Sequence, residues 1–90
     1  MKTTSAGTIE SMDCLVTVSE GSPGSGVTVA ITGSSAARFS TAMKKTVLAT
    51  AQELACSGDM TIAVQDNGAL DLVLAARTKA AVLRFTGGAA

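Results

Sequence analysis

The chain has 90 residues, and its seven Lys and Arg residues balance seven Asp and Glu residues to a formal net charge of zero. This length allows one domain around one hydrophobic core, so we expect a single domain over residues 1–90 with loose tails at 1–7 and 86–90. A neutral chain with two Phe residues and no Tyr or Trp lacks the basic patches and stacking rings with which proteins bind nucleic acids. The absence of His also excludes Ser-His-Asp and Cys-His nucleophiles and imidazole metal ligands.

The first half of the chain predicts strands. Residues 8–10 form a short extended segment, residues 11–13 a turn, and residues 14–18 a strand rich in β-branched side chains. The segment 19–26 is rich in Gly and Ser, which predicts a flexible loop. Residues 27–32 alternate between apolar and other side chains, which predicts a half-buried strand that pairs with the previous one in a hairpin.

The second half predicts two helices separated by a strand. Apolar side chains recur every three or four residues over 36–55, which predicts an amphipathic helix whose apolar stripe is Phe39, Met43, Val47, Ala51 and Leu54. Residues 60–65 alternate as a strand and residues 66–68 are a turn. Residues 69–84 follow a helical pattern whose apolar stripe is Leu70, Val73, Leu74 and Ala81. This order predicts an α+β fold, a small and mainly antiparallel β-sheet with two helices packed on one face, as a two-layer sandwich.

Cysteine usage and targeting indicate a cytoplasmic protein. Cys14 and Cys56 could form one disulfide, but the first seven residues contain no apolar run of the kind found in signal peptides. Because cytosolic cysteines stay reduced, we expect two free thiols that pack as small hydrophobic side chains. No stretch approaches the ~20 apolar residues that span a bilayer, so we expect no membrane association.

The side chains that could act in catalysis are few. Glu10 and Asp13 flank the predicted turn, but carboxylates at this spacing are more typical of a solvated turn than of a site. The Gly-rich segment lacks the Gly-Lys-Ser/Thr ending of a phosphate-binding loop, and no group of Cys, Asp and Glu has the spacing of metal ligands. The residues therefore indicate that the chain is not an enzyme by itself. Such a protein can still take part in chemistry by carrying a cofactor.

A covalent cofactor needs an exposed hydroxyl on a turn with little bulk around it. Ser11 meets this requirement between Glu10 and Asp13, at the start of a predicted strand. Ser34 and Ser35 instead have a structural role available, as caps of the following helix. Other serines also fall in predicted loops, so residue chemistry alone leaves the choice open: Ser5, Ser22, Ser25 and Ser57.

Two segments carry a more specific pattern. The first is Ala6-Gly7-Thr8-Ile9-Glu10-Ser11, followed by Asp13. The second is Asp66-Asn67-Gly68-Ala69-Leu70-Asp71, which continues to Leu74, Ala75-Ala76-Arg77 and Ala80-Ala81. Together they resemble the citrate lyase acyl carrier protein (gamma subunit) family, the first its N-terminal signature and the second its Asp-x-Gly-Ala-Leu-Asp…Ala-Arg pattern. The resemblance covers roughly Ala6 to Arg84, and Met12 departs from it where we would expect Gly or Ser.

The resemblance implies that Ser11 carries a phosphoribosyl-dephospho-coenzyme A arm, 2'-(5''-phosphoribosyl)-3'-dephospho-CoA, through a phosphodiester. Glu10 and Asp13 would be the flanking recognition residues. In that family the thiol of the arm holds an acetyl group that the alpha subunit exchanges for citrate, and the magnesium-dependent beta subunit cleaves the citryl group to oxaloacetate. The implied partners are these two subunits, the prosthetic-group transferase and the acetate:thiol ligase, and the chain itself is a non-catalytic carrier.

The second segment is expected to have a plainer role. Asp71 complements the dipole at the start of a helix, and Arg77 pairs with a carboxylate or faces a partner subunit. Two other functions stay open. The carrier subunit of malonate decarboxylase resembles this family and uses the same type of arm, although the second segment favours citrate lyase. A small α+β interaction or ligand-sensing module without a covalent cofactor would make Ser11 an ordinary turn serine.

Overall fold

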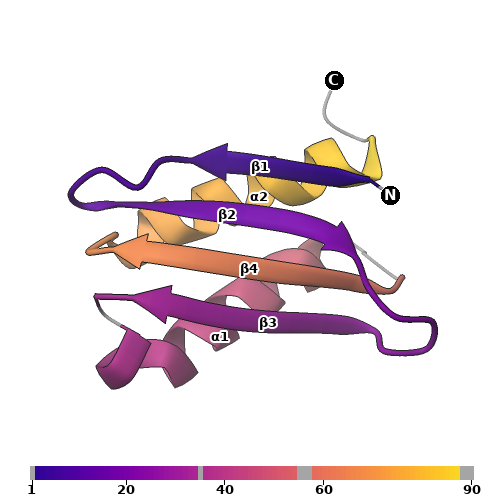
Figure 1. Cartoon of the computed structure of the whole chain (residues 1–90), viewed down its shortest axis with the longest axis horizontal. Helices are drawn as coiled ribbons and strands as arrows, with labels where there is room; N and C mark the ends of the chain where they lie inside the picture. The colour runs from indigo at the N-terminus through magenta and orange to yellow at the C-terminus, as the bar shows by residue number, and fades with distance from the viewer. Residues whose placement is uncertain (1, 35, 55–57, 88–90) are drawn as a thin grey trace.

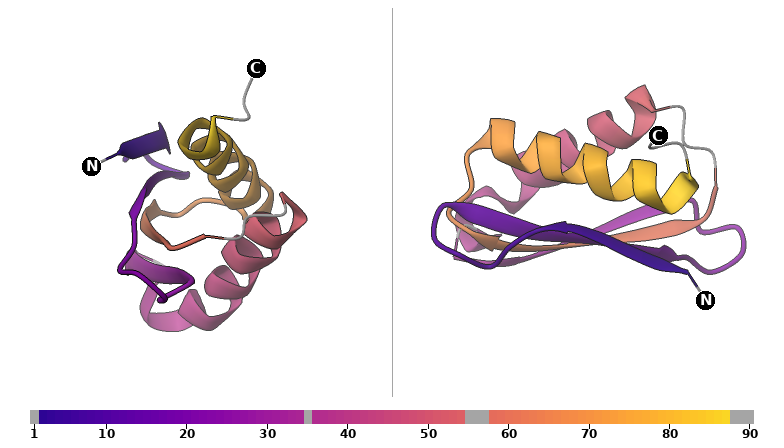
Figure 2. Two further views of the ribbon diagram at one scale, coloured as in Figure 1. Left: turned by 90° about the vertical axis from the view of Figure 1, so that its right-hand side faces the viewer. Right: turned by 90° about the horizontal axis from the view of Figure 1, so that it is seen from above.

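A four-stranded sheet with two helices on one of its faces makes up the computed structural model, which describes residues 2–34, 36–54 and 58–87 (Figure 1). The helices form a second layer that leaves the other face of the sheet uncovered (Figure 2). This arrangement confirms the predicted α+β fold. The elements in chain order are β1 (Thr3–Gly7), β2 (Asp13–Glu20), β3 (Val27–Gly33), α1 (Ala36–Glu53), β4 (Met60–Asn67) and α2 (Asp71–Thr86).

The strands are ordered β1-β2-β4-β3 across the sheet. β2 is antiparallel to both β1 and β4, and β3 is parallel to β4, so the sheet is mostly antiparallel. The predicted hairpin between residues 14–18 and 27–32 is wrong, because β4 lies between β2 and β3 and pairs with both. The central position suits β4, whose residues Met60, Ile62 and Val64 are all buried under the helices.

The N-terminal residues differ from the expected loose tail. Residues 3–7 form the edge strand β1, although their mostly polar side chains carry no apolar alternation. The strand is held by its pairing with β2 and by α2, since Thr4 Oγ1 donates to the Ala81 carbonyl at 2.8 Å and Arg84 Nη1 donates to the Ser5 carbonyl at 2.7 Å. At the other end of the chain, α2 continues to Thr86, and residues 88–90 of the expected tail lie outside the described residues.

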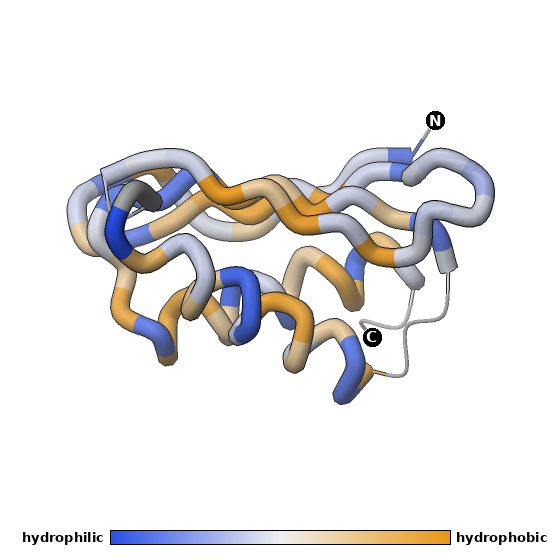
Figure 3. The backbone as a smooth tube through the Cα atoms, turned by 90° about the horizontal axis from the view of Figure 1, so that it is seen from below, coloured by the Kyte–Doolittle hydropathy of each residue, from blue (hydrophilic) through white to orange (hydrophobic). Residues whose placement is uncertain are grey.

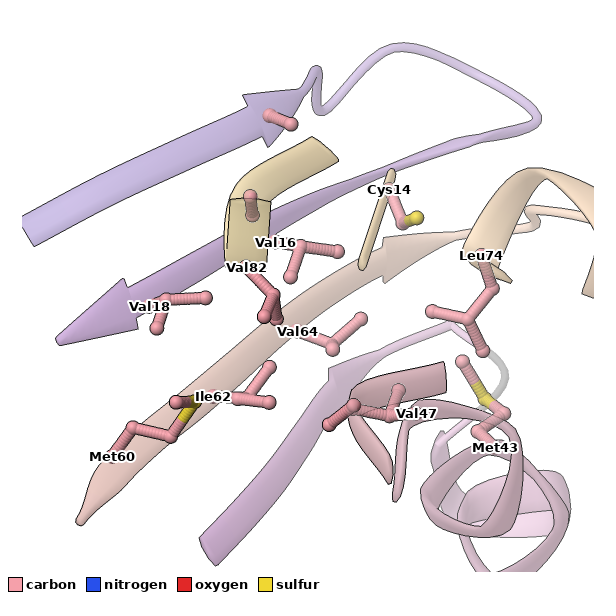
Figure 4. Packing of buried hydrophobic residues seen from close by; sticks show 13 residues of the cluster. Cys14, Val16, Val18, Met43, Val47, Met60, Ile62, Val64, Leu74 and Val82 are labelled. Atoms are coloured by element: carbon pink, nitrogen blue, oxygen red, sulfur yellow. The ribbon is translucent and has the colours of Figure 1, made fainter. Parts of the chain in front are cut away.

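The hydrophobic core lies between the sheet and the helix layer (Figures 3 and 4). The predicted apolar stripe of α1 is confirmed at Met43, Val47 and Ala51, whereas Phe39 at its start is exposed. In α2 the buried face includes Thr78, whose hydroxyl has no hydrogen-bond partner among the described residues. The core consists of Ala6, Cys14, Val16, Val18, Met43, Val47, Ala51, Met60, Ile62, Val64, Leu74, Ala81 and Val82.

The Gly-rich loop between β2 and β3 crosses the start of β4 and is tied to it. Both oxygens of the Asp59 carboxylate accept backbone bonds from this loop, one from Gly24 N and one from Gly26 N, each at 2.8 Å. These N–H groups lower the pKa of Asp59. The loop lies at the end of the sheet opposite to the connection between β1 and β2 (Figure 1). Among the described residues, no helix is long and apolar enough to span a membrane.

Candidate functional site

Ser11 lies on the loop 8–12, which connects β1 to β2 and includes the segment expected as extended. Asp13 N donates to the Glu10 carbonyl at 3.1 Å, which closes a turn with Ser11 and Met12 as its central residues. Ser11 is exposed, and its hydroxyl forms no hydrogen bond with any residue that the structure describes. The serine oxygen is therefore open to solvent and is not needed to hold the turn.

The Asp13 carboxylate fixes the turn from the β2 side. It accepts hydrogen bonds from Thr8 Oγ1 and Cys14 N, both at 2.7 Å, and from Arg77 Nε and Nη2 at 3.1 and 3.0 Å. The two bonds from Arg77 form the bidentate, charge-assisted geometry that is the strongest type of side-chain pairing. The Arg77 guanidinium, helped by Thr8 and Cys14 N, lowers the pKa of Asp13 to about 2. Asp13 is thus ionised and fully engaged within the chain.

Gly7 allows β1 to end at this turn. Its φ of 97° lies in the left-handed region that favours glycine. A Cβ at this position would overlap with the Cys14 carbonyl oxygen and would lie 3.1 Å from Cδ of Arg77. The close approach lets Thr8 N donate to the same Cys14 oxygen at 3.1 Å. The Gly-Thr pair of the first segment therefore has a structural reason, because a side chain at residue 7 would push the loop away from β2 and α2.

The second segment lies directly against the first. Asn67 binds the loop 8–12 twice, since its carbonyl accepts from Met12 N at 2.7 Å and its Nδ2 donates to the Ile9 carbonyl at 3.0 Å. The bounds predicted for the turn at 66–68 are wrong, because β4 continues to Asn67 and Gly68 forms a bridge with Asp13. The Asp66 carboxylate stabilises the end of the strand by accepting from Gly68 N and Ala69 N at 3.1 and 3.0 Å. Two segments that are distant in the chain thus hold one turn between them.

Met12 has an unusual backbone conformation. Its φ of 63° is left-handed, which is uncommon for a residue with a long side chain and free of cost for glycine. This explains in physical terms why we expected Gly or Ser at this position. The Met12 side chain extends into solvent beside Ser11 and is 63% exposed.

Several large hydrophobic side chains are exposed at the end of the molecule where this turn lies (Figure 1). In the described part of the chain they belong to the loop 8–12, the first turn of α1 and the start of α2, which all lie at one end of the molecule (Figure 1). We call them the apolar rim: Ile9, Met12, Phe39, Leu70 and Leu72. Single exposed apolar residues are ordinary, but a group of them marks an interaction surface. The helical periodicity missed this surface, because it assigned Phe39 and Leu70 to core stripes.

Among the described residues near Ser11, the nucleophilic side chains are hydroxyl groups and the thiol of Cys14. Cys14 is free and fully buried, and burial, with the nearby Asp13 and Asp66 charges, raises its pKa to about 11. A buried thiol of this kind is unreactive. Cys56, the second expected thiol, lies outside the described residues. Within the described ranges no three carboxylate or thiol side chains come together as a metal site.

Comparisons with known proteins assign this arrangement to a class. The model of an acyl carrier family described as malonate decarboxylase delta subunit (MdcD) matches residues 1–85, nearly the whole chain. The chain is also similar to curated citrate lyase acyl carrier proteins. It is 42% identical to that of Fusobacterium nucleatum over 79 residues, which cover 88% of this chain and 82% of the relative. It is 43% identical to that of Pectobacterium atrosepticum over 89 residues, which cover 98% of this chain and 88% of the relative.

These matches place the chain in the class of small acyl carrier proteins. Within that class, the chain belongs to the citrate lyase acyl carrier protein family.

Proposed function

We propose that the chain is the non-catalytic carrier subunit of a cytoplasmic citrate lyase, the complex that cleaves citrate to acetate and oxaloacetate. Ser11 carries the phosphoribosyl-dephospho-CoA arm through a phosphodiester and presents its acyl cargo to the alpha and beta subunits. The observation that carries this proposal is the exposed Ser11 hydroxyl, which is free of hydrogen bonds to the described residues. It lies on a turn that is held by both segments on which the resemblance rests.

The residues around Ser11 fit an attached phosphodiester. The hydroxyl oxygen supplies the bond, and its neighbours on the turn are exposed, so a transferase can reach it. A phosphodiester is anionic, and two carboxylates beside it would repel it. The ion pair with Arg77 compensates the charge of Asp13, which leaves Glu10 as the nearby carboxylate without an ion pair among the described residues. We therefore give Asp13 a positioning role and Glu10 the role of contacting the transferase.

The carrier acts by holding and orienting. When bound, the arm supplies the thiol that carries the acyl group. Gly7, Asn67 and the Asp13–Arg77 pair keep the serine oxygen at one place relative to the sheet. Tethering at a fixed point raises the effective concentration of the cargo at each partner to the millimolar range for short flexible linkers, so that transfer becomes nearly unimolecular. Because the catalytic groups lie in the partners, the carrier needs neither His nor a reactive Cys.

The apolar rim is the surface that we assign to the partner subunits. Leu72 is 81% exposed and Leu70 is 62% exposed, although both are large and apolar. Burying one such side chain in an interface contributes about 1.5–3 kcal/mol. A partner that covers the rim also brings its own catalytic centre next to Ser11, because the rim includes Met12, the next residue in the chain.

A malonate decarboxylase carrier is the second candidate, and the description of the matching family model favours it. Reconstitution separates the two. The wild-type chain and the variants Ser11→Ala and Ser22→Ala are each treated with the prosthetic-group transferase and then added to alpha and beta subunits of citrate lyase that lack a carrier. Ser22→Ala is the control, because Ser22 lies on the loop at the opposite end of the sheet. We expect citrate cleavage with the wild type and Ser22→Ala and none with Ser11→Ala. Cleavage of malonate with decarboxylase subunits, and none of citrate, would favour the second candidate.

A further inference from the structure

A groove lies between the first turns of α1 and α2, at the same end of the molecule as Ser11. Its volume is about 260 Å³, and it is lined by Phe39, Ala42, Met43, Ala69, Asp71 and Leu74. Met43 and Leu74 are buried and meet between the helices, where they form the floor (Figure 4). The exposed ring of Phe39 and the exposed methyl group of Ala42 form one wall.

The groove begins next to the Ser11 turn. Met12 N is bound to the carbonyl of Asn67 at 2.7 Å, and a Cβ placed on Gly68 would lie 3.9 Å from Cα of Met12. Ala69, the next residue, already lines the groove. A flexible chain that starts at Ser11 therefore reaches this groove by passing over one short stretch of backbone.

The lining selects an uncharged ligand. The walls and floor are apolar except for Asp71, whose carboxylate accepts a hydrogen bond from Thr46 Oγ1 at 2.6 Å. An anionic group beside Asp71 would be repelled by its carboxylate, whereas an amide or thioester would not. The Arg38 guanidinium already lies over the Phe39 ring of the opposite wall, 5.4 Å from its centroid. Sites for whole drug-sized ligands occupy about 300–1,000 Å³, so this smaller groove suits a fragment, such as the end of a longer chain.

We propose that the groove binds the uncharged terminal segment of a pantetheine-type arm, its cysteamine end with a small acyl thioester. The proposal rests on the attachment at Ser11 described above. Because the arm is attached at Ser11, the effective concentration of its end near the groove is in the millimolar range. A groove with a millimolar dissociation constant is then occupied about half of the time. When the arm is bound in the groove between transfer steps, water is kept from the thioester by Met43, Leu74 and Phe39.

The test uses the unmodified chain, so its outcome does not depend on whether Ser11 carries an arm. S-acetyl-pantetheine is titrated into ¹⁵N-labelled protein and amide shifts are followed by NMR. We expect saturable shifts at residues 39–43 and 69–74 with a millimolar dissociation constant. Ala42→Phe fills the groove from an exposed position and should weaken binding about tenfold, equivalent to 1.4 kcal/mol. Ala49→Phe, exposed on the same helix face two turns away, should bind like the wild type.

Phe39→Ala removes a wall without adding bulk and should also weaken binding, which keeps the test valid if Ala42→Phe loses its folded spectrum. The proposal is overturned if no saturable shifts occur, if they fall outside the groove, or if Ala42→Phe binds as tightly as the wild type. A different occupant is indicated if the thioester does not bind but Ala42→Phe weakens binding of the lyase subunits. The groove would then hold a side chain of a partner, and the proposal would be overturned. If native protein carries no adduct on Ser11, the proposed function is contradicted. The NMR measurement of thioester binding is independent of that outcome, because it uses the unmodified chain.

Discussion

Arg77 in α2 donates two hydrogen bonds to Asp13, the residue that closes the Ser11 turn, at 3.1 and 3.0 Å. The pair joins two segments that lie 64 residues apart in the chain. It links the helix layer to the loop 8–12, so that the position of the serine depends on the packing of α2.

Replacing Arg77 tests this link. Arg77→Lys keeps a positive charge but loses the two-bond geometry. We expect the variant to fold, because Arg77 is partly exposed, while the pKa of Asp13 rises towards its usual value and arm transfer to Ser11 slows several-fold. NMR titration of the Asp13 carboxyl and a transferase assay measure both effects. Arg38→Lys, remote from Asp13, is the control, and an unchanged Asp13 pKa in Arg77→Lys would contradict the account.

The same carboxylate predicts how stability depends on pH. The pKa of Asp13 is lowered in the folded state to about 2 from an ordinary value of 3.8. A group of this kind stabilises the fold fully above its unfolded-state pKa and loses that contribution as the pH falls through the folded-state pKa. The free energy of unfolding should therefore fall between about pH 4 and pH 2. Denaturant titrations of Asp13→Asn should show a shallower decline than the wild type. Asp59, whose pKa is also lowered, contributes to the decline that remains, and equal slopes would refute this.

The folding pattern was predictable where it is local. The β-branched side chains identified β2, alternation identified β3 and β4, and helical spacing identified both helices. The turn predicted at 66–68 was placed too early, because β4 continues to Asn67. β1 was not predicted, because its polar residues form a strand only through their contacts with β2 and α2. The strand order was not predicted either, because β4 lies between β2 and β3 through long-range pairing that no local pattern encodes.

For the candidate site, the sequence predicts which residues take part, and the structure adds how they contact one another. The resemblance singled out Ser11, Glu10 and Asp13, and Arg77 was left between a carboxylate and a partner. The structure pairs Arg77 with Asp13, a contact that charge alone cannot choose among seven acidic residues. The exposure of Phe39 was missed because helical periodicity cannot tell where the sheet beneath a helix stops.

Thr78 offers a test of the core. Its hydroxyl is fully buried and has no hydrogen-bond partner within the described structure. Thr78→Val replaces the hydroxyl with a methyl group of similar size, so we expect the free energy of unfolding to rise by roughly 1–2 kcal/mol. Thr50→Val is the matched control, because Thr50 Oγ1 donates to the Thr46 carbonyl at 2.9 Å and its loss should bring no gain. Chemical denaturation compares the two, and a less stable Thr78→Val would show that the hydroxyl has a partner.

Leu72 tests the assignment of the apolar rim. Since its side chain is 81% exposed, Leu72→Ser should change the free energy of unfolding by no more than about 0.5 kcal/mol. Its affinity for the lyase subunits should fall about tenfold, because an apolar contact worth about 1.4 kcal/mol is lost. Calorimetric titration with the purified subunits measures this. Ala30→Ser, on the uncovered face of the sheet, should bind normally, and equal losses in both variants would move the interface away from the rim.

The mass of the intact protein tests the central claim most directly. Protein is isolated from its own host during growth on citrate, together with Ser11→Ala and Ser22→Ala variants expressed in the same cells. The account predicts one adduct with the mass of a phosphoribosyl-dephospho-CoA group on the wild type and on Ser22→Ala, mapped to Ser11 by fragmentation, and none on Ser11→Ala. An unmodified wild-type chain in cells that are cleaving citrate, or an adduct that persists in Ser11→Ala, would contradict it.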